Sequence, residues 1–252
     1  MSIVHRNHRF IFLKSRKTAG TSLELHFIKN TVLGTDVWAT SRDGRHYGVA
    51  QRKRHCVLRV GARRFFLTVP GAGRIGNGRS LIKQHQGAEE LRRVLGEGLW
   101  SSSRKAVGVR NPWDNLLSYW RWSVRGREGR SSSTATPFED WAWAALSGDR
   151  KAIKSAGSID INKLLLDFVF DGDEPVADVL LYFERLNDSL RQLAEILDVP
   201  IPELSMRTKA SERPDYRPYY TDSLAEAVGR KYERYLRLTG YSFDAPQKFG
   251  TA

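Results

Sequence analysis

The stretch RFIFLKSRKTAGTS, residues 9–22, decides the fold of this chain. Its first five residues, RFIFL, form a short apolar run that predicts a buried strand. Small and polar residues fill positions 14–22, and a helix is predicted from about Leu23 to Lys29. A strand, a turn of small residues and a helix in this order predict an α/β fold with a P-loop-like phosphate site.

Two later apolar runs repeat this order. They are KAVGV at residues 105–109, which leads into a helix starting at Pro112, and DVLLYF at 178–183, which precedes an amphipathic helix from Leu186 to Leu197. Strands that alternate with helices predict a central parallel sheet flanked by helices. A chain of 252 residues with 40% hydrophobic content can bury one sizeable core, so we expect a single domain over residues 1–252.

The other segments carry weaker patterns. Strands are predicted near residues 56–60 and 65–69, and helices over 87–96, 137–146 and 159–168, with a last helix that Thr221 caps and whose Leu224, Val228, Tyr232 and Tyr235 share one face. Gly71, Gly73 and Gly76 spell GxGxxG, but no helical pattern follows, so we interpret them as part of a mobile loop near a substrate. The composition of residues 124–136 predicts a loop that projects from the surface.

Composition limits the classes of partner. Forty-one Lys and Arg against 28 Asp and Glu give a formal charge of +13, which fits nucleic acid, an anionic membrane surface, a nucleotide or an acidic glycan. Cys56 is the single cysteine, which excludes an intrachain disulfide and favours a reducing compartment. The apolar run near the N-terminus is too short for a signal-peptide core or a membrane span. We therefore expect a cytoplasmic protein without a membrane span.

The loop after the first strand has the chemistry of an anion site. Small residues let the backbone curl so that successive N–H groups point at one anion, and the following helix adds the positive end of its dipole. No Gly-Lys-Ser/Thr occurs, so this is not a Walker loop, and we expect no metal. The candidate residues are Lys17, Thr18, Ala19, Gly20, Thr21 and Ser22; the alternative is an ordinary strand-to-helix turn with a surface lysine.

A second candidate anion site follows the strand at 105–109. Arg110 ends that strand, where open α/β sheets place ligands, and Ser118 lies two turns into the next helix. An arginine can clamp a phosphate and a serine hydroxyl can add a bond. Two anion sites on one sheet imply a ligand with two separated phosphates. For Arg110 alone, a structural salt bridge at the helix terminus is the alternative.

His85, just before the predicted helix at 87–96, is a candidate general base. Transfer to a hydroxyl needs a base that is largely neutral near pH 7, and histidine suits that role. A helix cap or a solvated side chain is the alternative for His85, and five other histidines compete with it.

Together, these three segments resemble the PAPS-dependent sulfotransferases (PAPS is 3'-phosphoadenosine-5'-phosphosulfate), in particular the polysaccharide-type branch. The family carries a K-T-[GA]-G-T-S loop, an R-N-P-x-D-x-x-x-S segment and a preceding H-x-x-A-x-E-[LI] segment. This chain has KTAGTS at 17–22, HQGAEEL at 85–91 and RNPWDNLLSY at 110–119. Its tail also resembles the family, in YFERL at 182–186, YRPYYT at 216–221 and GYSF at 240–243.

The resemblance implies a role for each segment. Lys17 would neutralise charge on the departing phosphate oxygen, and the loop through Ser22 would hold the 5'-phosphosulfate. Arg110 and Ser118 would bind the 3'-phosphate, while His85 would take the proton of the acceptor. The implied cosubstrate is PAPS and the product is 3'-phosphoadenosine-5'-phosphate (PAP). The acceptor would be a hydroxyl or an amine, on a sugar or an anionic molecule.

The protein departs from the family in two places. Lys14, Ser15 and Arg16 stand where the family often has His-x-Pro, so Arg16 is a candidate contact for the sulfate or the acceptor. Ser22 replaces an aromatic residue that stacks on adenine in many relatives. Arg207 and Lys209 are further candidates for the nucleotide, against the alternative of a solvated loop.

Three other functions compete with this hypothesis. A nucleotide-dependent small-molecule kinase would share the first strand, loop and helix, but it should need magnesium and an acidic ligand for it. A basic nucleic-acid-binding protein would need a continuous positive face. A sulfotransferase-like scaffold could also serve for binding alone.

Overall fold

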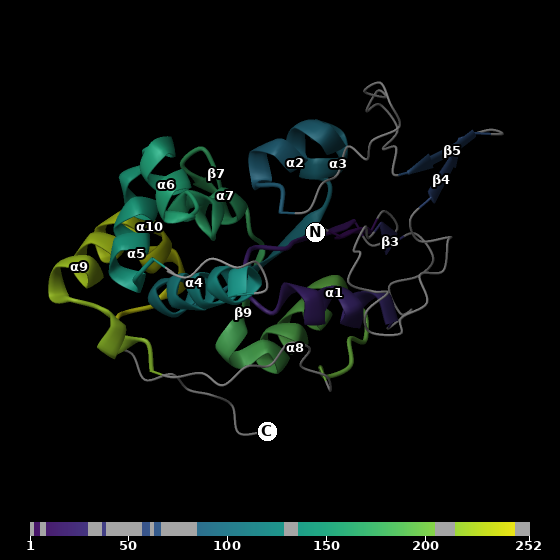
Figure 1. The fold of residues 1–252 in the computed structure, drawn as a ribbon. Coiled ribbons are helices and arrows are strands. Elements are labelled where there is room, and N and C mark those ends of the chain that lie inside the picture. Colours follow the sequence, from purple (N-terminus) through teal and green to yellow (C-terminus); the bar gives the residue numbers. More distant parts are fainter. Residues whose placement is uncertain are drawn as a thin grey trace.

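The structure, a computed structural model, describes residues 3–5, 9–29, 37–38, 57–60, 63–66, 85–128, 136–204 and 215–244. Its centre is a five-stranded sheet in the order β3-β1-β2-β6-β9, with helices on either side (Figure 1). The fold is therefore α/β, as the sequence predicts. The predicted strand at 56–60 is β4 (Val57–Val60). The strand predicted at 65–69 shares only residues 65–66 with β5 (Arg63–Phe66), and 67–69 lie outside the described residues. β4 and β5 pair as a separate antiparallel ribbon.

The sheet is parallel only in its three strands β2, β6 and β9. These are β2 (Phe10–Leu13), β6 (Arg104–Val109) and β9 (Val179–Tyr182), with Phe12 opposite Ala106 and Ala106 opposite Val179. The strands β1 (Ile3–His5) and β3 (Val37–Trp38) extend the sheet in antiparallel order. The expected parallel sheet is thus a mixed one, because β1 and β2 are joined by a connection too short for a parallel crossover.

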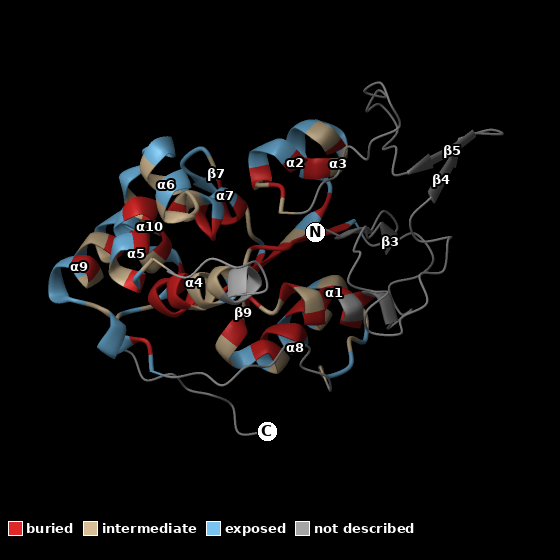
Figure 2. Cartoon of the chain, viewed as in Figure 1, coloured by how far each residue is buried: buried red, intermediate tan, exposed pale blue. Residues whose placement is uncertain are grey.

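Alternation along the strands divides the core between the two faces of the sheet. On one face, Phe10 and Phe12 of β2 pack with Phe27 of α1 (Gly20–Lys29) and with α8 (Leu186–Leu197). On the other face, the alternating residues Ile11 and Leu13 belong to a core cluster with residues of several other helices. Figure 2 shows these inner helix faces as buried.

Most of the predicted helices are confirmed, with some changes at their ends. Besides α1 and α8, the helices of the described residues are α2 (Ala88–Leu95), α3 (Glu97–Ser101), α4 (Pro112–Glu128), α5 (Phe138–Ser147), α6 (Arg150–Ala156), η4 (Ile161–Lys163), α7 (Leu166–Val169), η5 (Phe183–Arg185), η6 (Arg217–Tyr219), α9 (Asp222–Lys231) and α10 (Glu233–Thr239). The predicted helix at 159–168 is wrong in its continuity, since η4 and α7 replace it. The last helix is likewise two helices that meet at Tyr232, although the predicted face stays buried.

Some parts of the structure differ from the prediction, and some predictions cannot be compared with it. The helix α4 runs through the first part of the predicted projecting loop at 124–136. The short hairpin of β7 (Phe170–Asp171) and β8 (Glu174–Pro175), with α3 and α6, was not predicted. Cys56, the three glycines of GxGxxG, Arg207 and Lys209 lie outside the described residues. Among the helices that are described, none has the length and apolar character needed to cross a membrane.

Candidate functional site

The loop between β2 and α1 has an unusual backbone. Lys17 and Ala19 have φ values of 60° and 55°, in the left-handed region, whereas Thr18 between them does not. Left-handed φ is uncommon for residues other than glycine, so two of them in three positions indicate a segment that its surroundings hold in place. A backbone that alternates in this way turns N–H groups toward one side, as in an anion-binding nest.

The start of α1 adds to this arrangement. The first main-chain bond of the helix joins the N–H of Leu23 to the C=O of Ala19 at 3.0 Å, so the helix supplies no acceptor for the amides of Gly20, Thr21 and Ser22. The positive end of the helix dipole is also directed at the loop. The side chain of Ser22 is buried, so a ligand would meet its backbone and not its hydroxyl.

Contacts with β6 fix the first half of the loop. The hydroxyl of Ser15 donates to the C=O of Gly108 and lies 2.9 Å from Oγ1 of Thr18. A Cβ on Gly108 would stand 2.6 Å from that same Oγ1, so only glycine lets the loop lie against the strand. Thr18 is fully buried and donates to the C=O of Ser15. Thr18 is a predicted site residue, but because its side chain is buried, only its backbone could contact a ligand.

The two lysines of the loop have different environments. Nζ of Lys14 lies 2.7 Å from Oε2 of Glu24 in α1, and both side chains are buried. A Cβ on Gly20 would come within 2.4 Å of Cγ of Lys14, so this glycine makes room for the buried lysine. Lys17 is half-buried, with Nζ 5.9 Å from the ring centre of Trp122, an exposed residue. The charge of Lys14 is neutralised inside the protein, and of the two lysines only Lys17 is partly exposed.

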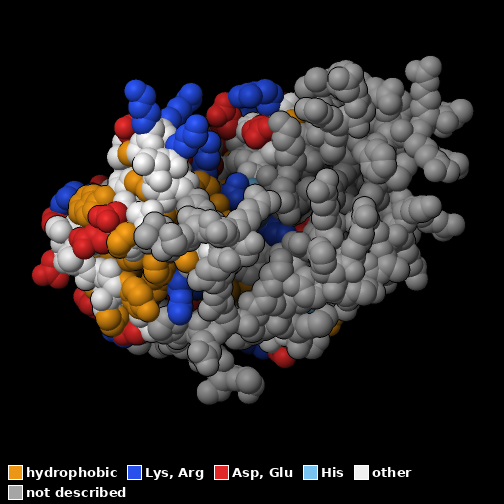
Figure 3. Space-filling view, in the orientation of Figure 1, with side chains coloured by type: hydrophobic (Ala, Val, Ile, Leu, Met, Phe, Trp, Pro, Cys, Tyr) orange, Lys and Arg blue, Asp and Glu red, His pale blue; other side chains and the backbone are white. Residues whose placement is uncertain are grey.

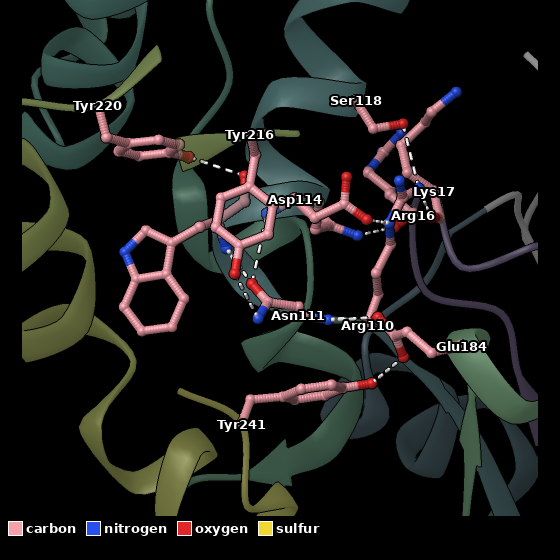
Figure 4. Close-up of polar contacts among 12 residues, drawn as sticks. Arg16, Lys17, Arg110, Asn111, Asp114, Ser118, Glu184, Tyr216, Tyr220 and Tyr241 are labelled. Atoms are coloured by element: carbon pink, nitrogen blue, oxygen red, sulfur yellow. Dashed lines mark hydrogen bonds and ion pairs between the residues drawn. The ribbon is translucent and has the colours of Figure 1, made fainter. Parts of the chain in front are cut away.

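Arg110 joins the two predicted anion sites. Its Nη1 donates to the C=O of Lys17 at 2.7 Å and to Oγ of Ser118 at 3.2 Å. Its Nε donates to Oδ2 of Asp114 at 2.7 Å in a buried ion pair, and its guanidinium stacks on the Phe183 ring at 4.1 Å. The structural ion pair that the sequence left open for Arg110 is thus present, and Lys17 and Ser118 still meet at the same guanidinium (Figure 4).

Asn111 fixes the start of α4 beside this site. Its Oδ1 accepts from the N–H groups of Trp113 at 3.1 Å and Asp114 at 3.4 Å, which makes it the N-cap, and Pro112 begins the helix. Its Nδ2 donates to Oη of Tyr216 at 3.2 Å and to the C=O of Ser242 at 3.0 Å. Sequence reasoning missed this role, although an Asn-Pro pair before a helix is a typical cap signal.

The C-terminal segments hold Arg110 and Asn111 in place. Oη of Tyr235 accepts from the N–H of Arg110 at 3.1 Å and donates to its C=O at 2.9 Å. Oε1 of Glu184 accepts from the N–H of Asn111 at 3.1 Å, while Oε2 accepts from Tyr241. Burial raises the pKa of Glu184 and raises that of Tyr235. The C-terminal segments therefore have a structural role, which is to hold the backbone of Arg110 and Asn111 in place.

His85 lies against the loop from the side of α2. Its Nδ1 is 3.1 Å from the C=O of Lys14, and because a carbonyl only accepts, Nδ1 carries the proton and Nε2 carries the lone pair. Burial, together with nearby positive charges that include Arg16, lowers the pKa of His85 from 6.5 to about 3. The imidazole is therefore neutral at pH 7 and its tautomer is fixed.

The structure thus brings the predicted site residues to one end of the sheet. Lys17, Arg110 and Ser118 are in direct contact, and His85 bonds to the residue three positions before Lys17. Their common place follows from β2 and β6, which are adjacent and parallel and end on the same side. Within the described part of the protein, no group of three or more His, Cys, Asp and Glu residues could hold a metal ion.

Comparisons with protein-family models, with curated protein sequences and with solved structures give no match to this protein. The resemblance to sulfotransferases therefore depends on the quoted motifs and on how the fold places them.

Proposed function

We propose that this protein is a sulfotransferase that moves the sulfuryl group of PAPS to a hydroxyl or amine of an acceptor. The observation that supports it best is the position of Arg110, which bonds to the loop at Lys17 and to Ser118 at once. A ligand with two phosphates, one in the loop and one beside Ser118, would meet both anion sites without any rearrangement of the backbone. PAPS has phosphate groups at two separate positions, so it fits this arrangement better than a ligand with a single phosphate group does.

The donor groups fit the two anions. Backbone amides of a nest and the N-terminus of α1 suit the 5'-phosphosulfate. At the 3'-phosphate position, the hydroxyl of Ser118 is half-buried, and no described residue accepts a hydrogen bond from Nη2 of Arg110. Asp114 offsets part of the positive charge of Arg110, so we assign it the role of orienting the guanidinium.

In the proposed reaction the acceptor oxygen attacks sulfur in line with the bond to the 5'-phosphate oxygen. Nε2 of His85 takes the acceptor proton while the new O–S bond forms. The old O–S bond breaks, and its electron pair stays on the phosphate oxygen, where the ammonium group of Lys17 and the loop amides stabilise it. Stabilising charge that develops in the transition state is commonly the largest catalytic contribution.

The low pKa of His85 belongs to the protein without its anionic ligand. A base with a pKa of about 3 is neutral at pH 7 but accepts a proton poorly. Bound phosphates bring negative charge close to Lys14 and Arg16, the neighbours whose positive charges contribute to the lowering. We therefore expect the pKa of His85 to rise when PAP binds, although burial, the largest cause of the lowering, remains. The imidazole would then be a better base in the complex than in the free protein.

Calorimetric titration of the purified protein with PAP, ADP and ATP in metal-free buffer tests the proposal. We expect PAP to bind with micromolar affinity and both ADP and ATP to bind at least about tenfold more weakly, a difference of about 1.4 kcal/mol. Equal binding of ATP, or no binding of PAP, would contradict the proposal.

Two further titrations and one activity assay separate the alternatives. A kinase should bind ATP in a magnesium-dependent way. A nucleic-acid-binding protein should bind random DNA with a steep loss of affinity as salt rises. A scaffold without activity should bind PAP yet transfer no label from ³⁵S-labelled PAPS to any acceptor. We also propose a cytoplasmic location, which fractionation of cells that express the protein would test.

A further inference from the structure

Trp122 on α4 is the most exposed of the large hydrophobic side chains in the part of the chain that the structure describes, with 56% of its surface accessible. Single hydrophobic side chains are common on protein surfaces, and others reach the surface over α5 and α9 (Figure 3). Exposure alone therefore does not mark a site. Trp122 differs from Trp143, which is 40% exposed on α5, because its ring contacts a predicted site residue.

The ring of Trp122 lies beside the ammonium group of Lys17. Nζ of Lys17 is 5.9 Å from the ring centre, within the range of a cation–π contact, in which the negative face of the ring attracts the cation. The contact joins the loop between β2 and α1 to α4. It adds a link through the side chain of Lys17 to the main-chain link that Arg110 makes with the C=O of the same residue.

The ring of Trp122 is itself held by other aromatic rings. The ring centre of Tyr119, three residues earlier on α4, lies 5.2 Å from that of Trp122 and 6.0 Å from that of Trp141. Trp141 is buried in the core, and its Nε1 donates to the C=O of Gly157 at 3.2 Å. Because aromatic side chains have only two torsions, this row of three rings gives Trp122 a defined place although it is exposed.

The position of Trp122 on α4 relates it to the second anion site. Trp122 comes four residues after Ser118, so the two residues lie on the same side of the helix. Nη1 of Arg110 bonds both to Oγ of Ser118 and to the C=O of Lys17. This side of α4 therefore contacts Lys17 twice, at its carbonyl group through Arg110 and at its ammonium group through the Trp122 ring.

A contact of this kind matters because lysine is flexible. The ammonium group of a lysine is carried on a stem of four carbons, and it loses conformational freedom when an anion fixes it. A contact that already restricts the stem in the free protein makes that loss smaller when the ligand binds.

We propose that Trp122 is a positioning residue whose ring holds the ammonium group of Lys17 on the α4 side of the loop, in the free protein and in the nucleotide complex. This inference rests on the proposed sulfotransferase function, in which Lys17 stabilises the departing phosphate oxygen. It adds to that function a residue that acts through Lys17 and needs no contact with the nucleotide.

A double-mutant cycle on PAP affinity tests the inference. PAP is titrated calorimetrically into the full-length protein as the wild type, Trp122→Leu, Lys17→Ala and the double variant. We expect Trp122→Leu to weaken PAP binding about 2-fold to 10-fold, which corresponds to the cost of immobilising one flexible side chain. In the Lys17→Ala background the same substitution should have no effect, because the group that Trp122 holds is absent.

Two further variants complete the test. Trp122→Phe keeps an aromatic face and should retain most of the wild-type affinity for PAP. Trp143→Leu is the matched control, because it also removes an exposed tryptophan, and it should bind PAP like the wild type. Urea unfolding of all these tryptophan variants should resemble that of the wild type, since neither tryptophan is buried.

An equal loss of affinity in both backgrounds would overturn the inference, because Trp122 would then act without Lys17. Unchanged affinity in Trp122→Leu would also overturn it, and so would a gain, which would show that the contact has to break before PAP can bind. Failure of PAP to bind the wild type would contradict the proposed function. Binding of PAP without coupling in the cycle would contradict only the role of Trp122, so the two failures are distinguishable.

Discussion

Arg110 and Asn111 separate two regions that are built differently. On one side lie Arg16, Lys17 and Ser118, which we call the loop side, and on the other lie Tyr216, Tyr220 and Tyr241 (Figure 4). Together with Tyr235, whose hydroxyl bonds to the backbone of Arg110, these three tyrosines form what we call the tyrosine side. On the tyrosine side, three of the four hydroxyls donate to backbone carbonyl groups and the fourth donates to Glu184. On the loop side the backbone has left-handed residues, and two of the three side chains are cations.

This difference separates the residues that hold Arg110 and Asn111 in place from the residues that would contact a ligand. The hydroxyls of the tyrosine side have partners inside the protein, so their hydrogen bonds stabilise the fold. The two cations of the loop side are partly exposed, so a ligand could contact them. Substitutions should therefore lower the free energy of unfolding on the tyrosine side and lower turnover on the loop side.

The largest expected effect belongs to His85. In His85→Ala we expect turnover to fall by about 10²-fold to 10⁴-fold, the usual contribution of a general base. The measurement is the rate of label transfer from ³⁵S-labelled PAPS at saturating substrates, with PAP affinity as the control for an intact nucleotide site. Turnover like that of the wild type would remove His85 as the base.

The two loop lysines should separate activity from stability. Lys17→Ala should reduce turnover by about 100-fold or more, near 3 kcal/mol of transition-state stabilisation, with little change in thermal stability. Lys14→Ala should instead lower the free energy of unfolding by about 3 to 5 kcal/mol, because it leaves Glu24 buried without its partner. Kinetics and urea unfolding of both variants measure this, and the reverse pattern would contradict the contrast between the lysines.

On the tyrosine side, Tyr235→Phe should lower the free energy of unfolding by about 1 to 3 kcal/mol, because the buried N–H of Arg110 loses its acceptor. PAP affinity of the folded protein should change little. Tyr219→Phe, which alters an exposed ring, is the control and should unfold like the wild type. A loss of PAP binding without a loss of stability would break the proposed division of roles.

The smallest effect, taken per pH unit, concerns acid stability. The pKa of His85 is lowered from 6.5 to about 3 by folding, so below pH 6.5 the unfolded protein binds a proton that the folded protein does not. The free energy of unfolding should therefore fall as pH drops from about 6.5 toward 3, by at most about 1.4 kcal/mol per pH unit for this group. His85→Asn should remove that part of the slope in urea unfolding; identical slopes would show that the imidazole titrates normally.

The sequence predicted the meeting of Lys17, Arg110 and Ser118 because each segment follows a buried strand, and adjacent parallel strands end together. It could not predict the Lys14–Glu24 pair, since that depends on how α1 is rotated about its axis. The contacts of Asn111 with Tyr216 and Ser242 join residues more than 100 positions apart, and no local pattern marks them. The inward side chain of Thr18 follows from the left-handed backbone on either side of it, which propensity does not predict.

The central claim is that one ligand with two phosphates meets both the loop and Ser118. Its most direct test compares the affinities of PAP and AMP, which differ only in the 3'-phosphate, for the wild type and for Ser118→Ala. We predict that the wild type prefers PAP and that Ser118→Ala loses about tenfold for PAP while its affinity for AMP is unchanged. Equal affinity of the wild type for PAP and AMP, or an equal loss for both in Ser118→Ala, would contradict the account.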